Sequence, residues 1–182
     1  MPATPVLETE RLILRPISND DLAATHRVFD DPAVRRYLWD DRPVSLEDTA
    51  SVVQASARDF SERGVGLFGV RLRGAEELVG LCGLRWEDGI GDMEIIYCLL
   101  PELWGQGLAT EAAEACLRFA FEGARLERVM AGADEPNAAS LRIIEKPGMR
   151  FVGRILPAAP EAPYFVLNRA DFPRANARGG ER

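Results

Sequence analysis

Residues 93–120 constrain the fold most, because a strand, a glycine turn and an amphipathic helix follow one another there without a gap. Residues 93–100 are apolar and rich in β-forming side chains, and Pro101 ends the strand because proline has no N–H to donate. From Ala109 to Ala120 the apolar residues recur at helical spacing, with charged residues on the opposite face. We therefore predict a strand followed directly by a surface helix with one buried stripe.

The turn between this strand and helix, Gly105-Gln106-Gly107, has no serine, aspartate or asparagine that could cap the helix. Uncapped N–H groups at the positive end of a helix, reached through glycines that allow close backbone approach, suit a phosphate or pyrophosphate. A tight turn whose donors are satisfied by water explains the same residues equally well. The turn alone is thus a candidate anion site.

Length and charge narrow the class of protein. The chain has 182 residues and a formal charge of -7, so we expect a single domain over residues 1–172 and a disordered tail over residues 173–182. The acidic balance argues against a nucleic-acid partner. No apolar run is long enough to span a bilayer, and the amino end lacks the features of a signal peptide. We expect a cytoplasmic monomer or homodimer that does not bind membranes.

The rare residue types limit the chemistry. His26 is the only histidine and Lys146 the only lysine, so multi-histidine metal sites and a Gly-Lys-Ser/Thr phosphate loop are excluded. Cys82, Cys98 and Cys116 are far apart in apolar segments and suggest neither disulfides nor zinc. We predict no metal site, and catalysis would depend on carboxylates, hydroxyls, water and positioning.

Periodicity predicts a mixed sheet. Strands are expected at residues 7–17, 66–72, 77–86, 93–100, 128–134, 151–156 and 163–167, and helices at 18–29, at 45–63, from Ala109 and from Pro136, with a helical turn at 33–39. The three strands between residues 66 and 100 should form an antiparallel meander. The predicted fold class is α/β (mixed α+β), with three layers and a central mixed β-sheet of about seven strands flanked by helices on both faces.

Gly64-Val65-Gly66-Leu67-Phe68-Gly69 matches the Gly-x-Gly-x-x-Gly dinucleotide fingerprint. That fingerprint works only when a strand precedes it and a helix follows. Here the order is reversed. We therefore interpret Gly64 as a left-handed cap of the incoming helix.

The segment Trp104-Gly105-Gln106-Gly107-Leu108-Ala109 resembles the GCN5-related N-acetyltransferases (GNAT), whose pyrophosphate loop has the pattern Gln/Arg-x-x-Gly-x-Gly/Ala. Gly107 and Ala109 match, and Trp104 stands where the consensus has Gln or Arg, as is typical of the RimJ/RimL-like branch. Residues 7–15 (LETERLILR), 137–140 (NAAS) and 145–149 (EKPGM) also resemble that branch. The resemblance covers nearly the whole chain to about Phe172, and it implies the three-layer GNAT-like fold.

The resemblance also implies how acetyl-CoA binds as cosubstrate. Its pantetheine would pair with backbone around Cys98, Leu99 and Leu100. Its diphosphate would rest on the N–H groups of Gly105, Gln106, Gly107, Leu108, Ala109 and Thr110. Asn137 would bond the cofactor from the next helix, although a helix-start asparagine that bonds nearby backbone is an equal alternative.

The implied mechanism is direct attack of an amine on the thioester, which requires a base for the ammonium and an acid for the departing thiolate. Glu94, a carboxylate in an apolar strand, is the candidate base, and a structural ion pair with an arginine is its alternative. Ser140 is the candidate acid, although it could equally satisfy a backbone carbonyl. Many relatives have a tyrosine just after this helix, where the present chain has Met149 and Phe151. Ile96 also replaces the glycine of the family's Glu-x-Gly-Tyr pattern.

The sequence thus predicts an acyl-CoA-dependent N-acetyltransferase. Its partners would be acetyl-CoA and a primary amine, on a peptide or protein N-terminus or on a small molecule. The alternative is a catalytically weak acyl-CoA-binding sensor or partner module, motivated by the missing tyrosine and the altered strand motif.

Overall fold

A computed structural model of the protein describes residues 5–134 and 136–173, so the predicted tail lies outside the described residues except for Pro173. The strands are β1 (Leu7–Glu8), β2 (Leu12–Pro16), β3 (Leu67–Leu72), β4 (Leu78–Glu87), β5 (Asp92–Leu99), β6 (Arg128–Gly132), β7 (Arg150–Gly153) and β8 (Tyr164–Asn168). The α-helices are α1 (Leu22–Phe29), α2 (Pro32–Leu38), α3 (Leu46–Arg63), α4 (Leu108–Arg118) and α5 (Ala138–Glu145). Short helical turns are η1 (Asn19–Asp21), η2 (Pro101–Leu103) and η3 (Phe119–Gly123), the last a π-helical continuation of α4.

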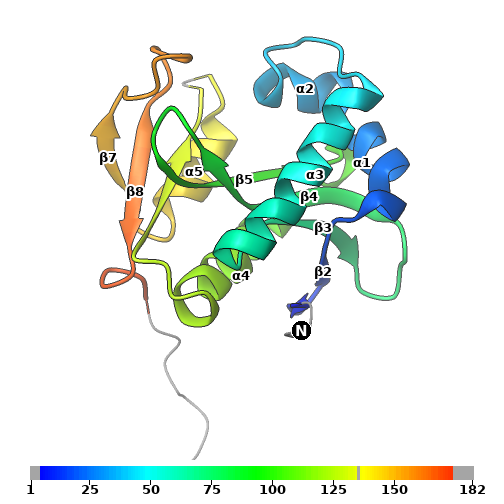
Figure 1. The fold of residues 1–182 in the computed structure, drawn as a ribbon, viewed down its shortest axis with the longest axis horizontal. Helices are drawn as coiled ribbons and strands as arrows, with labels where there is room; N and C mark the ends of the chain where they lie inside the picture. The colour runs from blue at the N-terminus through cyan, green and yellow to red at the C-terminus, as the bar shows by residue number, and fades with distance from the viewer. Residues whose placement is uncertain (1–4, 135, 174–182) are drawn as a thin grey trace, which may run out of the picture.

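The described strands form one eight-stranded sheet in the order β1-β2-β3-β4-β5-β6-β8-β7 (Figure 1). Only β5 and β6 pair in parallel among these strands, which confirms the predicted mixed sheet and the antiparallel meander of β3, β4 and β5. The predicted single strand over residues 7–17 is wrong. The Thr9 N–H donates to the Leu12 carbonyl at 3.0 Å, and this turn folds β1 back onto β2 with Leu7 opposite Leu14.

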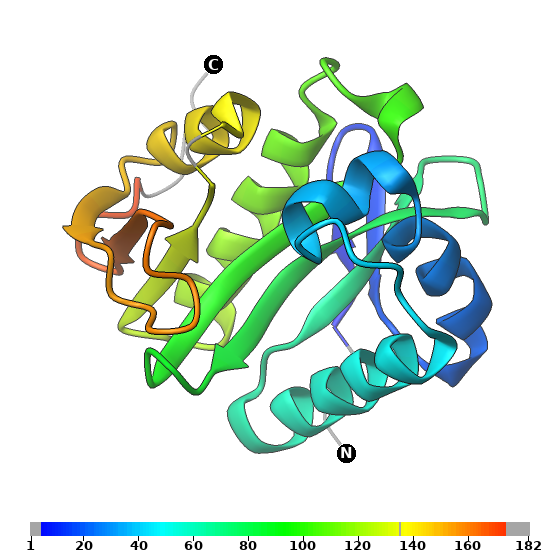
Figure 2. The same ribbon diagram turned by 90° about the horizontal axis from the view of Figure 1, so that it is seen from above.

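Helices cover both faces of the sheet, as predicted: α1, α2 and α3 lie on one face and α4 and α5 on the other (Figures 1 and 2). Each face has its own buried cluster. Ala112, Cys116 and Leu117 form the predicted buried stripe of α4, and all three are almost fully buried against the sheet. Three layers result because the sheet is apolar on both sides.

The boundary between α3 and β3 explains the Gly-x-Gly-x-x-Gly sequence. Ser45 and Asp48 form a capping box at the start of α3, and Gly64 ends the helix with a left-handed φ of 74°. Strand β3 begins at Leu67. A helix therefore precedes the glycines and a strand follows them, which confirms that they end a helix and do not form a dinucleotide-binding turn.

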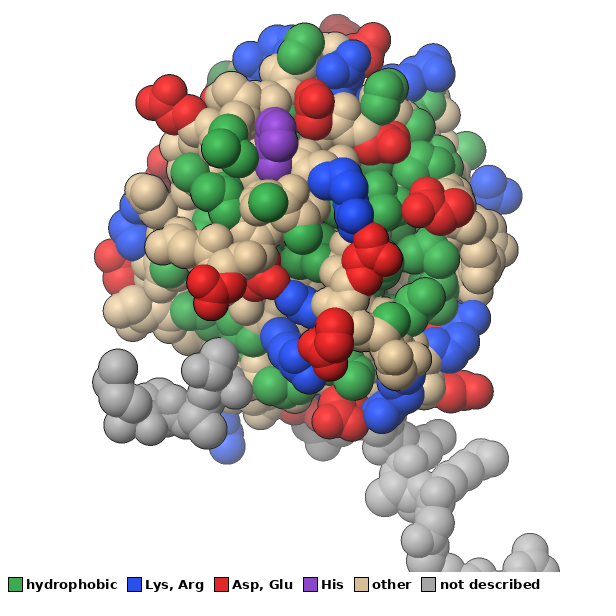
Figure 3. All heavy atoms as spheres, turned by 90° about the vertical axis from the view of Figure 1, so that its right-hand side faces the viewer, with side chains coloured by type: hydrophobic (Ala, Val, Ile, Leu, Met, Phe, Trp, Pro, Cys, Tyr) green, Lys and Arg blue, Asp and Glu red, His purple; other side chains and the backbone are tan. Residues whose placement is uncertain are grey.

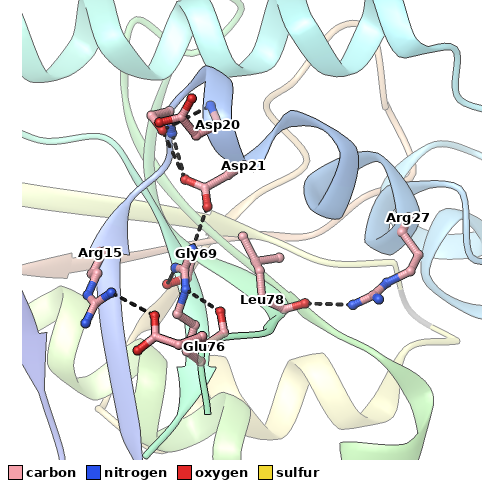
Figure 4. A network of polar contacts seen from close by, with 9 residues as sticks. Arg15, Asp20, Asp21, Arg27, Gly69, Glu76 and Leu78 are labelled. Atoms are coloured by element: carbon pink, nitrogen blue, oxygen red, sulfur yellow. Dashed lines mark hydrogen bonds and ion pairs between the residues drawn. The ribbon is translucent and has the colours of Figure 1, made fainter.

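A polar network joins the start of α1 to β3 and to the hairpin between β3 and β4 (Figure 4). The Arg71 side chain, which is 11% exposed, places Nη2 2.5 Å from Oδ1 of Asp21. Arg71 also donates to the carbonyl oxygens of Glu76 at 3.1 Å and Gly69 at 3.3 Å. This ion pair fixes α1 on the sheet, and α1 in turn supports α2 at the rim of the cavity described below.

The side of the molecule on which α1, α2 and α3 lie carries acidic and basic side chains mixed together (Figure 3). None of the helices in the described ranges has the length and apolar character needed to cross a membrane.

Candidate active site

A cavity of about 580 Å³ opens between β5 and β6. The two strands pair at Glu94 and Met130, and beyond this point they line opposite walls, with Tyr97 and Leu99 on one side and Gly132 on the other. The amino ends of α4 and α5 border the cavity, and α2 lines it as well. The sheet therefore exposes the edge of a central strand to a ligand-sized space.

Along β5, the backbone N–H and C=O groups of successive residues point alternately toward β4 and toward this cavity. The Leu100 N–H donates to the Val79 carbonyl at 2.9 Å across the β4 side. Because hydrogen-bonded and non-hydrogen-bonded pairs alternate along an antiparallel ladder, the backbone groups of Cys98 also face β4, whereas those of Tyr97 and Leu99 face the cavity. Among the three residues predicted to pair with pantetheine, Leu99 thus has the open edge.

The other two predicted strand residues differ in position. Cys98 borders the cavity, and burial raises the pKa of its thiol to about 12. Leu100 is buried in the cluster beneath α1, α2 and α3, and it does not appear among the described residues that line the cavity.

Trp104 lies across the edge of β5. Its indole N–H donates to the Leu99 carbonyl at 2.7 Å, and its side chain borders the cavity while remaining half-exposed. The residue that departs from the family's Gln/Arg consensus therefore bonds the strand edge directly.

The amino end of α4 has the predicted uncapped geometry. Gly107 is the N-cap residue with a φ of 76°, and within the described residues no side chain caps the helix. Gly105 also has a positive φ, and a Cβ on it would have nothing within 4 Å. Gly105, Gly107, Leu108, Ala109 and Thr110 line the cavity.

Gln106 does not belong to this lining in the described structure. Its side-chain amide donates to the Glu102 carbonyl at 3.0 Å, and its own carbonyl accepts a hydrogen bond from Arg11 Nη1 at 2.9 Å. Arg11 also forms an ion pair with Glu111 of α4, at 2.6 Å. Sequence reasoning missed this contact between the amino-terminal segment and the glycine turn.

A tyrosine meets the predicted acid. The Tyr97 hydroxyl lies 2.7 Å from Ser140 Oγ, and burial raises the pKa of Tyr97 well above its ordinary value. Asn137 is the N-cap of α5, and its Oδ1 accepts the Ser140 N–H at 3.1 Å, which is the backbone-bonding alternative for this residue. Ser140, Asn137 and Tyr97 all line the cavity. The sequence could have pointed to Tyr97 through the segment Glu94-Ile95-Ile96-Tyr97, in which Tyr97 stands at the tyrosine of the Glu-x-Gly-Tyr pattern.

Glu94 forms the arginine ion pair that was the alternative to a catalytic base. It is 3% exposed, and its Oε2 accepts hydrogen bonds from Arg85 Nε at 3.0 Å and Nη2 at 2.8 Å. Tyr164 packs beside it, and burial and then the charge of Glu94 raise the pKa of Tyr164. Glu94 is not among the cavity-lining residues of the described chain. Its role as the base stays a prediction.

Three other charged residues face the cavity and were not predicted. Asp134 is the one acidic residue among the described lining residues, and burial, followed by the negative charge of Asp40, raises its pKa. Arg142 of α5 and Lys146, the residue that follows α5, supply positive charge, and Lys146 forms an ion pair with Glu114 at 3.0 Å. Across the described ranges, the structure shows no group of three or more His, Cys, Asp or Glu side chains that could hold a metal ion.

A sheet that opens beside a helix with an uncapped amino end defines an α/β protein suited to an extended, anionic ligand. Residues 11–150 match the model of the acetyltransferase (GNAT) domain. The uncharacterized N-acetyltransferase YoaA of Bacillus subtilis (strain 168) is 32% identical over 150 residues, which are 82% of this chain and 85% of that protein. The chain therefore belongs to the GNAT acetyltransferase family.

Solved structures show the same fold. An acetyltransferase from Agrobacterium tumefaciens str. C58 aligns with a TM-score of 0.80 and 25% identity, over 90% of this chain and 94% of that one. A RimL ribosomal-protein acetyltransferase, solved in complex with coenzyme A, aligns with a TM-score of 0.72 and 19% identity, over 90% and 98% of the two chains. The predicted GNAT fold is thus confirmed, and a RimL structure is among those that share it.

Proposed function

We propose that this protein is an acyl-CoA-dependent N-acetyltransferase that transfers the acetyl group of acetyl-CoA to a primary amine, on a peptide or protein N-terminus or on a small molecule. One observation carries the proposal. A single cavity joins the uncapped amino end of α4, the open edge of β5 and the hydroxyl pair of Tyr97 and Ser140. These are a site for an anion, a site for an amide-containing chain and a proton donor.

The residues present fit acetyl-CoA. The N–H groups at the start of α4 suit its diphosphate, and Arg142 and Lys146 add positive charge at the same cavity. The backbone groups of Tyr97 and the N–H of Leu99 suit the amides of pantetheine, which would lie along β5 as an added strand, whereas the Leu99 carbonyl already accepts the Trp104 indole N–H. Coenzyme A bound to the RimL relative of the same fold supports this assignment.

We assign to Tyr97 and Ser140 the protonation of the leaving thiolate. When the amine nitrogen bonds to the thioester carbon, the carbon–sulfur bond breaks and the sulfur takes a proton from the acid. The nitrogen loses a proton as the amide forms, and this proton restores the acid. Tyr97 can supply this proton because its protonated phenol borders the cavity, and the Ser140 hydroxyl, 2.7 Å from the phenol oxygen, can stabilise the phenolate that forms. The tyrosine that is absent after α5 is thereby replaced by one from β5.

The mechanism also needs a base that accepts the proton of the substrate ammonium, and we assign this role to a carboxylate. Asp134 borders the cavity, whereas Glu94 is held by Arg85 and Tyr164 away from its lining. Burial and the nearby Asp40 disfavour ionised Asp134, so this carboxylate has a stronger tendency to accept a proton than an ordinary aspartate. We therefore assign the proton acceptor to Asp134 in preference to Glu94.

The proposal is tested by incubating the purified protein with acetyl-CoA and a panel of small amines and peptides. Amine-dependent release of CoA thiol above the hydrolysis blank is expected. Tight CoA binding without amine-dependent release from any member of the panel would indicate an acyl-CoA-binding module instead. A protein that does not bind CoA in calorimetry contradicts both functions.

The variants Asp134→Asn and Glu94→Gln, compared at saturating substrates, separate the two candidate bases. Only Asp134→Asn should abolish turnover.

A further inference from the structure

We propose that Arg11 is a positioning residue for the glycine turn: it holds the Gln106 carbonyl so that the Gly107 N–H points into the cavity, toward the diphosphate of CoA. This inference rests on the proposed function, because the diphosphate is the ligand of that N–H. Arg11 lies between β1 and β2, far from the turn in sequence, and it acts through the backbone.

Peptide geometry gives Arg11 this role. The Gln106 carbonyl and the Gly107 N–H belong to one planar trans peptide, so they point in opposite directions. Arg11 Nη1 donates to that carbonyl at 2.9 Å, on the side of the β1–β2 turn. The N–H must then face the other side, where Gly107 lines the cavity.

The turn needs such a restraint. Gly105 and Gly107 both have positive φ angles, of 73° and 76°, and glycine backbone changes conformation at little cost. A rotated peptide would present the Gln106 carbonyl oxygen to the cavity. An oxygen with partial negative charge would repel a diphosphate, so a free turn would lose part of its anion affinity.

Arg11 is itself held by Glu111 in the first turn of α4. Arg11 Nε and Nη2 lie 2.7 Å and 2.6 Å from Glu111 Oε2, and the Arg11 N–H and the Thr9 hydroxyl donate to Oε1 at 2.9 Å and 2.5 Å. Burial opposes ionisation of Glu111, but the hydrogen bonds from Thr9 and Arg11 outweigh it and lower its pKa. Arg11 therefore also neutralises a carboxylate that would otherwise repel an anion at this helix terminus.

Only an arginine side chain can make both contacts, because its planar guanidinium carries several N–H donors. One guanidinium bonds the Glu111 carboxylate and the Gln106 carbonyl at once. A lysine keeps the positive charge but has no planar fork that spans two acceptors. Arg11→Lys should therefore recover only part of the CoA affinity that Arg11→Gln loses.

The experiment compares two ligands and two arginines in the full-length protein. CoA contains the diphosphate and pantetheine does not, so their dissociation constants are measured by calorimetry and by ligand-observed NMR. Arg11→Gln should weaken CoA binding about tenfold, the effect of losing a charge-assisted hydrogen bond, and leave pantetheine binding within about twofold of wild type.

Arg73→Gln is the matched control. Arg73 is 45% exposed, as Arg11 is, and holds the same β1–β2 turn through the Thr9 carbonyl and Glu8, both at 2.9 Å. It should leave CoA binding unchanged. The inference is overturned if Arg11→Gln binds CoA like wild type, if both variants weaken CoA equally, or if pantetheine binding falls as much as CoA binding. A wild-type protein that binds no CoA overturns the proposed function instead.

Discussion

The Tyr97 hydroxyl lies 2.7 Å from the hydroxyl oxygen of Ser140 and 3.1 Å from its carbonyl oxygen. Tyr97 can therefore donate to the carbonyl while it accepts from the Ser140 hydroxyl, and the Ser140 N–H is held by Asn137. This arrangement fixes the phenol at the edge of the cavity between β5 and α5. Because the two hydroxyls are hydrogen-bonded to each other, we expect them to act as one unit when the leaving thiolate is protonated.

Tyr97→Phe should lower kcat with the best acceptor by about a hundredfold, the lower range for loss of a positioned acid. Steady-state kinetics measure this, and CoA binding by calorimetry should change by less than about twofold because the β5 backbone is kept. The double variant with Ser140→Ala should cost little more than Tyr97→Phe alone if the pair acts as a unit. A Tyr97→Phe enzyme with wild-type kcat would remove Tyr97 from the mechanism.

Gly107→Ala tests the glycine turn. An alanine at a φ of 76° costs about 1–2 kcal/mol of stability, and the turn can relieve this strain only by moving its N–H groups. We expect CoA affinity to fall about tenfold. Gly64→Ala is the control, since Gly64 has a φ of 74° at the end of α3, away from the cavity. It should lose similar stability in urea denaturation and keep its CoA affinity.

The parts of the fold that sequence predicted are those that local chemistry decides. Pro101 can end β5 wherever the strand lies, and Gly64 can end α3 without any distant partner. The turn at Thr9 was missed because a two-residue strand such as β1 has too little pattern of its own and forms only against β2. Apolar periodicity marks a buried face, but it does not mark where a short strand folds back.

The contacts of the site depend on which segments meet, and periodicity does not carry that information. Arg11 and Glu111 are 100 residues apart, and Tyr97 and Ser140 are 43 apart. The partner of Glu94 is closer in sequence, yet it depends on the register that places Arg85 opposite Glu94 in the β4–β5 hairpin. Residue types at the site could be predicted, and their partners could not.

The ion pair between Asp21 and Arg71 should contribute measurably to stability. The two side chains are 16% and 11% exposed, so Asp21→Asn leaves a mostly buried guanidinium without its counter-charge. We expect a loss of about 2 kcal/mol in the free energy of unfolding, below the full value for a buried pair because water reaches both groups. Glu76→Gln breaks the neighbouring pair with Arg15, at 87% and 47% exposure (Figure 4), and should change stability by less than about 0.5 kcal/mol. Equal losses in urea denaturation would contradict this ranking.

Asp134 should make stability depend on pH. Burial raises its pKa in the folded protein above that of an ordinary aspartate, so the folded state binds more protons than the unfolded state between the unfolded and the folded pKa. The free energy of unfolding attributable to this group therefore falls as pH rises through that window, and the penalty persists at neutral pH. Asp134→Asn should be more stable than wild type at pH 7, and its advantage should shrink toward pH 4. Urea denaturation at a series of pH values measures the difference, and Asp40→Asn should give part of the same gain because Asp40 contributes to the pKa shift of Asp134.

If Asp134→Asn is stabilised at pH 7 while losing turnover, the carboxylate is maintained for catalysis at a cost in stability. A constant stability difference across the pH series would show that Asp134 titrates as an ordinary surface carboxylate.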